Sequence, residues 1–146
     1  MKIIYLAEDD ADDRMFFEDA LKKINIPTQL TCAHDGVELM NTLENVTTPP
    51  PPPHIVFLDL NMPLKDGFKC LQEIRTTPIL KEIPVVIFST TGSDHAINKT
   101  YEDGANYFVC KPRSFDLLVK AIEMVLTLDL WKTPQPSKDK FVLSIT

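Results

Sequence analysis

The fold of this chain is decided by one stretch, Ile-Val-Phe-Leu-Asp-Leu-Asn-Met-Pro at residues 55–63. Its leading apolar residues form a short run bounded by turn residues, which is typical of a strand buried on both faces of a sheet. Asp59 stands at the carboxyl end of that strand. In open parallel sheets this end lines a crevice where ligands bind, so Asp59 is a candidate site residue as well as a turn residue.

Three other apolar runs also end in chemically distinct residues. Glu8 and Asp9 follow the run at 3–7, Ser89 and Thr90 follow the run at 85–88, and Lys111 follows the run at 107–110. If these runs are adjacent parallel strands, their carboxylates, hydroxyls and ammonium group converge on one edge of the sheet.

Strand and helix patterns alternate five times along the chain. The expected strands lie near 2–7, 29–33, 55–58, 85–88 and 106–110, and an amphipathic helix pattern follows each of them. This alternation predicts an α/β fold, a doubly wound five-stranded parallel sheet with helices on both faces. The common small version has the flavodoxin-like strand order 2-1-3-4-5. In that order Glu8, Asp9 and Asp59 share one pocket, with Ser89 and Lys111 on its far side.

Length and composition indicate one soluble domain. The 146 residues suffice for a single core, which we expect at 1–128, with 129–146 as an extension that forms no separate domain. No apolar stretch has the length of a membrane span or of a signal peptide, so we expect a cytoplasmic protein with no membrane partner. A net charge of -6 with no basic patch argues against nucleic-acid binding. The three widely spaced cysteines offer neither a disulfide framework nor a Cys-x-x-Cys site.

The predicted pocket holds several carboxylates and one lysine. Two carboxylates ~4 Å apart repel by roughly 4 kcal/mol at an effective dielectric near ~20, so three of them need a cation. Ligands that are all oxygen indicate Mg²⁺, with Mn²⁺ as the alternative metal. Lys111 and Ser89 then fit an anion, such as a phosphoryl group on Asp59, whose other oxygens they would stabilise.

Together these motifs resemble the response-regulator receiver domain of two-component signalling, over residues 2 to about 127. The resemblance implies that Asp59 is a phosphoacceptor served by a sensor histidine kinase or a phosphotransfer protein. It also implies that the chain is not an enzyme and signals by protein contact. The other implied roles are metal ligation by Glu8, Asp9, Asp59 and the backbone carbonyl of Asn61, phosphoryl contact by Ser89 and Lys111, a switch at Ser89, Thr90 and Phe108, and a cis peptide bond before Pro112.

Two positions depart from the commonest receiver pattern. Glu8 stands where Asp is usual, and Phe108 stands where Tyr is frequent. The longer Glu8 side chain is expected to act on the metal through water. The stretch at 7–14 is similar to single-domain regulators that partner bacteriophytochrome-type kinases.

Two other functions remain open at this point. A haloacid dehalogenase-like, Mg-dependent phosphatase also uses an Asp after an apolar strand, but it would carry a second Asp at the position of Asn61. A flavin-binding module would explain the hydroxyl-rich loop at 89–93. In flavodoxin-like proteins that loop follows the first strand, where this chain has acidic residues that would repel phosphate.

The last expectations concern the surface. The run Pro49–Pro53 is expected to be a stiff connection in polyproline II, with a role as a ligand of an aromatic groove as the alternative. The fourth helix, fifth strand and fifth helix are the expected surface for a target protein or a second copy of the chain. Val119, Met124 and Leu128 add apolar surface to that last helix, which favours association. The alternative is that the extension after Asp129, with Trp131 and residues 141–145, folds back and covers them, but its prolines are expected to make it a poor element for folding back.

Overall fold

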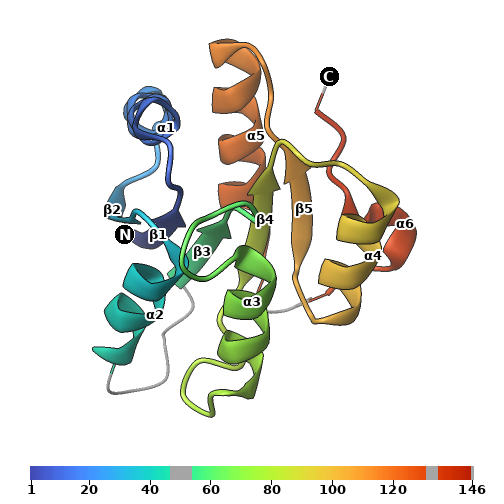
Figure 1. Cartoon of the computed structure of the whole chain (residues 1–146). Helices are drawn as coiled ribbons and strands as arrows, with labels where there is room; N and C mark the ends of the chain where they lie inside the picture. The colour runs from blue at the N-terminus through green and yellow to red at the C-terminus, as the bar shows by residue number, and fades with distance from the viewer. Residues whose placement is uncertain (47–53, 131–134, 146) are drawn as a thin grey trace.

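A computed structural model describes residues 1–46, 54–130 and 135–145 of the chain (Figure 1). The strands are β1 (Lys2–Ala7), β2 (Thr28–Ala33), β3 (His54–Leu58), β4 (Val85–Ser89) and β5 (Tyr107–Cys110). The helices are α1 (Ala11–Lys23), α2 (Gly36–Glu44), α3 (Gly67–Thr76), α4 (Asp94–Glu102), α5 (Phe115–Thr127) and α6 (Lys138–Phe141). The strands form one parallel sheet in the order β2-β1-β3-β4-β5, which confirms the predicted fold.

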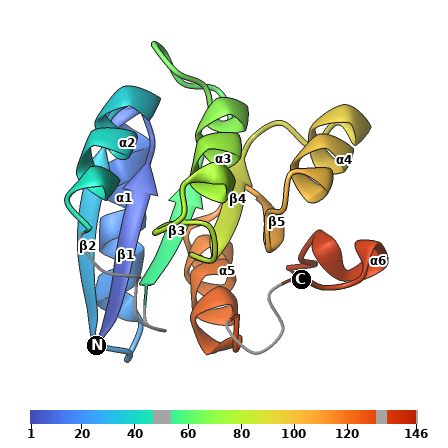
Figure 2. The same cartoon turned by 90° about the horizontal axis from the view of Figure 1, so that it is seen from below.

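The helices cover the sheet in two layers (Figure 2). α2, α3 and α4 lie on one face, and α1 and α5 lie on the other. Successive side chains of a strand point to opposite faces, so β3 supplies both cores: Val56 and Leu58 pack under the first layer, and Ile55 and Phe57 under the second. Every residue of β3 is buried, as its apolar run predicted.

Each of the five main helices begins at a side-chain cap. The cap oxygen accepts a hydrogen bond from the backbone N–H three residues on, at 2.8–3.2 Å. The capping residues are Asp10, Asp35, Asp66, Ser93 and Ser114. A cap of this kind stabilises a helix by about 1 kcal/mol, and here it also fixes where each strand-to-helix loop ends. The loops therefore keep the strand ends at one edge of the sheet.

The extension after α5 differs from the sequence-based expectation. We expected a poor fold-back element, but residues 135–145 fold back beside α4 and β5 and include α6 (Figure 1). Phe141 is fully buried and belongs to the core on the α4 side of the sheet. Burial of one large aromatic side chain gives the segment an anchor that its prolines do not oppose, because proline removes a donor but leaves the carbonyl acceptor.

The apolar surface expected on α5 is also smaller than predicted. Val119 and Leu128 pack against the core on the α1 and α5 side, as do Leu143 and Ile145 of the extension. Met124 is only partly exposed. The premise that these α5 residues lack a place within the chain is therefore wrong for Val119 and Leu128.

Two further expectations concern the proline run and membrane-spanning helices. The run Pro49–Pro53 lies outside the described residues. Among the residues that the structure describes, no helix has the length and apolar character needed to cross a membrane.

The close approach of α3 to β3 predicts the effect of a substitution at Gly67. A Cβ atom there would lie 2.2 Å from the Asp59 carbonyl oxygen and 2.8 Å from Leu60 Cα, both backbone atoms. We expect Gly67→Ala to lower the free energy of unfolding by ~1–3 kcal/mol, the usual range for overpacking, in urea denaturation. Gly92→Ala is the matched control, because its Cβ would meet only the Cys110 Sγ atom, at 3.1 Å. Equal stability of the two variants would contradict the prediction.

Candidate functional site

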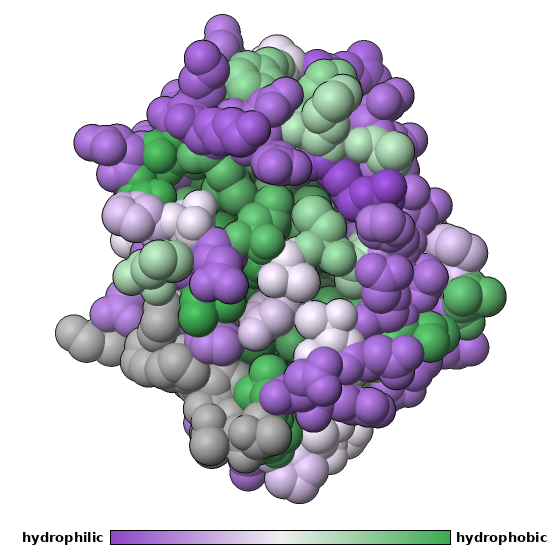
Figure 3. Space-filling model, turned by 90° about the vertical axis from the view of Figure 1, so that its left-hand side faces the viewer, coloured by the Kyte–Doolittle hydropathy of each residue, from purple (hydrophilic) through white to green (hydrophobic). Residues whose placement is uncertain are grey.

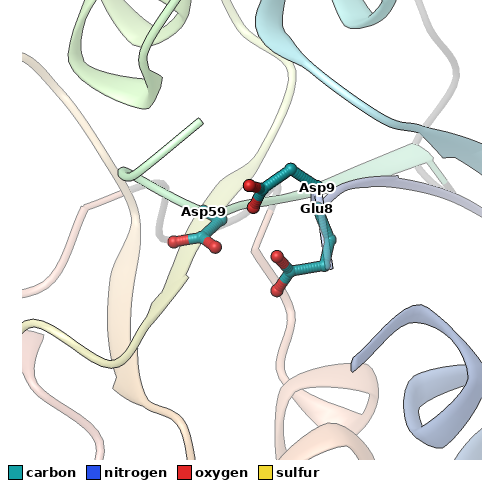
Figure 4. Close-up of side chains that lie close together, drawn as sticks. All are labelled: Glu8, Asp9 and Asp59. Atoms are coloured by element: carbon teal, nitrogen blue, oxygen red, sulfur yellow. The ribbon is translucent and has the colours of Figure 1, made fainter. Parts of the chain in front are cut away.

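The carboxyl ends of β1 and β3 bring three acidic side chains together. Ala7 of β1 pairs with Leu58 of β3, so Glu8 and Asp59 follow from neighbouring strands at the same level. The Asp59 N–H donates to the Ala7 carbonyl at 3.1 Å, which extends the ladder to the site itself. Figure 4 shows the carboxylates of Glu8, Asp9 and Asp59 directed toward one region from these two strand ends.

The three carboxylates form a compact cluster with unequal exposure. One oxygen from each of Glu8, Asp9 and Asp59 can be chosen so that all lie within 4.8 Å of one another. Glu8 and Asp59 are 2% and 6% exposed, whereas Asp9 is exposed. Burial weakens the screening of two of the charges, so their repulsion is stronger than that of surface acids.

Lys111 is the positive group of this cluster. Its ammonium group forms ion pairs with Glu8, with Asp13 at 3.1 Å and with Asp59 at 3.2 Å. The side chain is 11% exposed, and its Nζ lies 5.9 Å from the centre of the Phe88 ring. Three acceptors match the three N–H donors of an ammonium group, so its orientation is fixed.

Burial and neighbouring charges shift the pKa values of Glu8 and Lys111. Burial raises the pKa of Glu8 to about 8; the neighbouring Asp59 adds to the rise, and the hydrogen bond from Lys111 opposes it. Burial alone would lower the pKa of Lys111, but its hydrogen bond to Glu8 and the charge of Asp59 outweigh burial and raise it. The two shifts differ in origin: burial dominates at Glu8, whereas the neighbouring acids dominate at Lys111.

This donor set fits a divalent cation. Mg²⁺ prefers oxygen ligands ~2.1 Å away in an octahedron, so opposite ligands stand roughly 4.2 Å apart. The oxygens of Glu8, Asp9 and Asp59 already lie within 4.8 Å of one another, so small side-chain rotations bring them to that spacing. A cation would also offset the charge of Asp59, which adds to the rise that burial causes in the pKa of Glu8.

The other residues predicted for the site lie around this cluster. The Asn61 N–H donates to Asp59 Oδ1 at 3.3 Å, and its side-chain amide donates to Thr91 Oγ1 at 3.1 Å. Ser89 is fully buried at the end of β4, where its hydroxyl accepts the Thr91 N–H at 3.3 Å. Thr90 is exposed beside the site.

Two expectations from the resemblance concern residues of β5 and the loop after it. Phe108 lies in the core on the α4 side of the sheet, two residues before the strand end, and not in the acidic cluster. The cis peptide bond expected before Pro112 is absent, and no described residue has one. The preference of an X–Pro bond for cis is weak enough that sequence alone does not decide it.

Two residues of α1 contribute to the site although the sequence did not single them out for it. Asp13 pairs with Lys111, and Arg14 donates to the Glu8 carbonyl oxygen at 2.8 Å. No local signal in the sequence marks Asp13 for this role, because α1 begins at Ala11 and Asp9 lies outside the helix.

A pocket of about 430 Å³ opens beside the cluster. Asp13 and Lys111 line its inner side, and Phe16, Phe115 and Leu118 supply apolar walls from α1 and α5. Phe16 and Phe115 are 48% and 37% exposed. The pocket thus joins the charged cluster to an apolar surface.

Comparison with known proteins gives a consistent family. The family of the response regulator receiver domain matches residues 4–123. Response regulator Rcp1 of Synechocystis sp. is 34% identical over 124 residues, which cover 84% of this chain and 84% of Rcp1. A probable chemotaxis protein CheY of Rhizobium etli is 30% identical over 122 residues, which cover 84% of this chain and 90% of that protein.

Solved structures of response regulators have the same fold as this chain. The Mn²⁺-bound form of Rcp1 superposes with a TM-score of 0.76 at 32% identity, covering 94% of this chain and all of that one. The phosphorylated cyanobacterial phytochrome response regulator RcpA has a TM-score of 0.77 at 30% identity, covering 92% of this chain and 96% of that one. These matches give no support to a haloacid dehalogenase-like phosphatase.

Proposed function

We propose, from the premise that the chain belongs to the family of response regulator receiver domains, that Asp59 is the residue that accepts the phosphoryl group. The observation that carries the assignment is the position of this carboxylate. It stands at the end of a central strand, within an acidic cluster that fits a cation and in contact with the ammonium group of Lys111. A carboxylate oxygen attacks the phosphorus atom, and the bond to the donor's imidazole nitrogen or acyl oxygen breaks with its electron pair leaving on the donor.

The residues around Asp59 have distinct roles in this proposal. Lys111 already lies 3.2 Å from Asp59 Oδ2, close enough to pair with an oxygen of the transferred group. The Ser89 hydroxyl is proposed to pair with a second oxygen of the transferred group, as an uncharged donor beside Lys111. Thr90 lines the pocket through which a donor would reach the site. Ser89, Thr90 and Phe108 together form the proposed switch.

Glu8, Asp9, Asp59 and the Asn61 carbonyl are the proposed ligands of Mg²⁺ or Mn²⁺. Rcp1, 34% identical to this chain, has been solved in a Mn²⁺-bound form. The cation supplies positive charge against the transferring phosphoryl oxygens when it is bound. The acidic side chains hold it beside Asp59, and Lys111, which pairs with both Glu8 and Asp59, keeps its contact with Asp59.

The apolar surface around the pocket is the proposed docking site for the phosphodonor, a sensor histidine kinase or a phosphotransfer protein. Phe16 and Phe115 are large, partly exposed and adjacent to Lys111. Aromatic side chains at the edge of a cleft are the residue types that most often carry binding energy between proteins. A donor that covers them brings its phosphorylated group to Asp59.

The output of the switch is proposed to pass through α4, β5 and α5 to a target protein or a second copy of the chain. A conformational response can be no larger than the difference in contacts between the two states, typically a few kcal/mol. We also infer a role as a signalling module in the cytoplasm, with no enzymatic activity toward other molecules and no nucleic-acid partner.

The first prediction concerns Asp59. We expect Asp59→Asn to reduce incorporation of radiolabelled phosphate from acetyl phosphate to background, because the amide is not a nucleophile of this kind. The label on the unaltered chain should be lost in mild alkali, as an acyl phosphate is. Asp19→Asn, an exposed acid on α1, is the matched control and should label normally. Undiminished labelling of Asp59→Asn would remove Asp59 from this role.

The second prediction concerns the cation. Excess EDTA should stop labelling, since the phosphoryl group would otherwise approach uncompensated carboxylates. Asp9→Ala should weaken Mn²⁺ binding in calorimetric titration by at least ~10-fold, the lower end for loss of a supporting metal partner. Glu8→Ala should weaken it less, because the Glu8 carboxylate is already engaged by Lys111. Equal affinities of the two variants, or labelling that persists in EDTA, would contradict the proposed ligand set.

The third prediction separates the protein donor from small donors. A kinase is first chosen by screening candidates for phosphotransfer to the purified chain. We expect Phe16→Ala to slow transfer from that kinase ~5-fold or more, as loss of over ~1 kcal/mol at an interface does, relative to labelling by acetyl phosphate. Met15→Ala, a neighbouring exposed side chain on α1 that does not line the pocket, is the control. If the ratio of the kinase-transfer rate to the acetyl phosphate rate is equal in the unaltered chain, Phe16→Ala and Met15→Ala, the result argues against this docking surface.

A further inference from the structure

The segment Gln135–Ile145, called the tail below, forms contacts with both α4 and β5. Gln135 donates its side-chain amide to the carbonyl oxygens of Tyr101 at 2.7 Å and Ala105 at 3.0 Å. The Tyr101 hydroxyl donates to the Pro136 carbonyl oxygen at 2.9 Å. These bonds attach the tail to the last turn of α4 and to the loop that leads into β5.

Phe141 is the apolar anchor of the tail. Its ring is fully buried and meets the Tyr101 ring edge-on, with centroids 5.0 Å apart and an angle of 71°. It also meets the Phe108 ring, at 6.2 Å and 63°. One tail residue therefore touches both α4 and the aromatic residue of the proposed switch.

The tail backbone continues the sheet. The Leu143 N–H donates to the Phe108 carbonyl oxygen at 3.0 Å, and Val142 forms a parallel bridge with Phe108. The opposite edge of the sheet is different, since Figure 3 shows apolar surface between polar rims on the side of the molecule where β2 lies. The two edges are thus unlike, and the tail covers the one nearer the switch.

α4 is held weakly by the rest of the domain. Only Ala96 and Thr100 are buried within it, whereas α5 buries five residues. Helices with few buried contacts are the ones that shift at low cost. The contacts of the tail with Tyr101 therefore add to the few that fix α4 relative to β5.

We propose that the tail is an internal ligand of the α4–β5 surface and that phosphorylation of Asp59 weakens its docking. This inference rests on the proposed function. The hydrogen bonds and ring contacts of the tail are all made together in the arrangement of α4 and β5 described here. The tail is bonded to both α4 and β5, so a switch that moves α4 against β5 breaks some of these contacts and weakens docking.

The path from Asp59 to the tail is short. Ile87 and Phe108 are cross-strand neighbours in one core, and Ser89 shares the face of Ile87 because it lies two residues further along β4. A phosphoryl group that attracts the Ser89 hydroxyl moves the loop 90–93, which leads into α4, and leaves space beside Phe108. The Phe108 ring turns into that space and away from Phe141, while Tyr101 shifts with α4.

The effect is reciprocal. If phosphorylation loosens the tail, a docked tail opposes phosphorylation by the same free energy. The surface that the tail leaves fits a short segment whose one aromatic anchor ends a single helical turn, since this is what it holds when the tail is docked. A target protein with such a segment competes with the tail and wins when Asp59 carries phosphate.

Amide hydrogen exchange of the full chain in Mg²⁺, with and without the phosphoryl mimic beryllofluoride, tests the release. The Leu143 amide should exchange at least roughly fivefold faster with the mimic, the lower end of ordinary coupling between sites. The Val56 amide, bonded to the Pro84 carbonyl at 2.9 Å, reports on the sheet and should not change. Unchanged Leu143 exchange in a chain that labels at Asp59 overturns the inference alone, whereas failure of labelling overturns the proposed function. Protection of Leu143 that rises with chain concentration would also overturn it, because a second copy would then hold the tail.

Variants of the tail test the reciprocal effect. Phe141→Ala removes the anchor, and Tyr101→Phe removes only the hydrogen bond to Pro136 and keeps the ring contact. Both should label faster with acetyl phosphate than the unaltered chain, with the larger increase in Phe141→Ala. Lys140→Ala, an exposed tail residue, is the matched control and should label at the unaltered rate. Equal or slower labelling of Tyr101→Phe, which leaves the core intact, would overturn the proposal whatever the fate of Phe141→Ala.

Discussion

One ammonium group among four carboxylates is the constraint on which the site depends. Lys111 pairs with Glu8, Asp13 and Asp59, and Asp9 stands beside them without a share of that charge. The parallel sheet imposes the crowding, because the strand ends cannot separate while the ladder between β1 and β3 is intact. A change of charge at Asp59 therefore alters the electrostatic interactions of groups that lie in α1 or at the ends of β1, β3 and β5. A buried cluster of this kind converts a local chemical event into a force on several elements.

Much of the fold could be predicted, because the relevant signals are local. β3 is buried on both faces and has the unbroken apolar run typical of such a strand, and a helix follows each of the five strands as the amphipathic patterns predict. Parallel topology then places the ends of the strands at one edge. The convergence of Glu8, Asp9 and Asp59 follows from these two facts without knowledge of any side-chain contact.

What could not be predicted depends on contacts between distant parts of the chain. Asp13 meets Lys111 across 98 positions, and nothing near Asp13 distinguishes it from the other acids of α1. The fold-back of the tail was missed for a different reason. Proline was taken as an obstacle, but the Pro136 carbonyl accepts the Tyr101 hydroxyl, and Phe141 supplies the burial. One aromatic residue outweighs the composition of the segment that carries it.

The pairing of Val142 with Phe108 also protects the protein from its neighbours. An uncovered edge strand offers free N–H and C=O groups on which another chain can template a cross-β contact, and aromatic and β-branched residues strengthen such contacts. β5 contains Tyr107, Phe108 and Val109, so it is an aggregation-prone edge whenever it is bare. It is also only four residues long, and short edge strands are one of the devices that limit intermolecular sheet growth. The short length of β5 therefore limits intermolecular strand pairing when this edge is uncovered in a crowded cell.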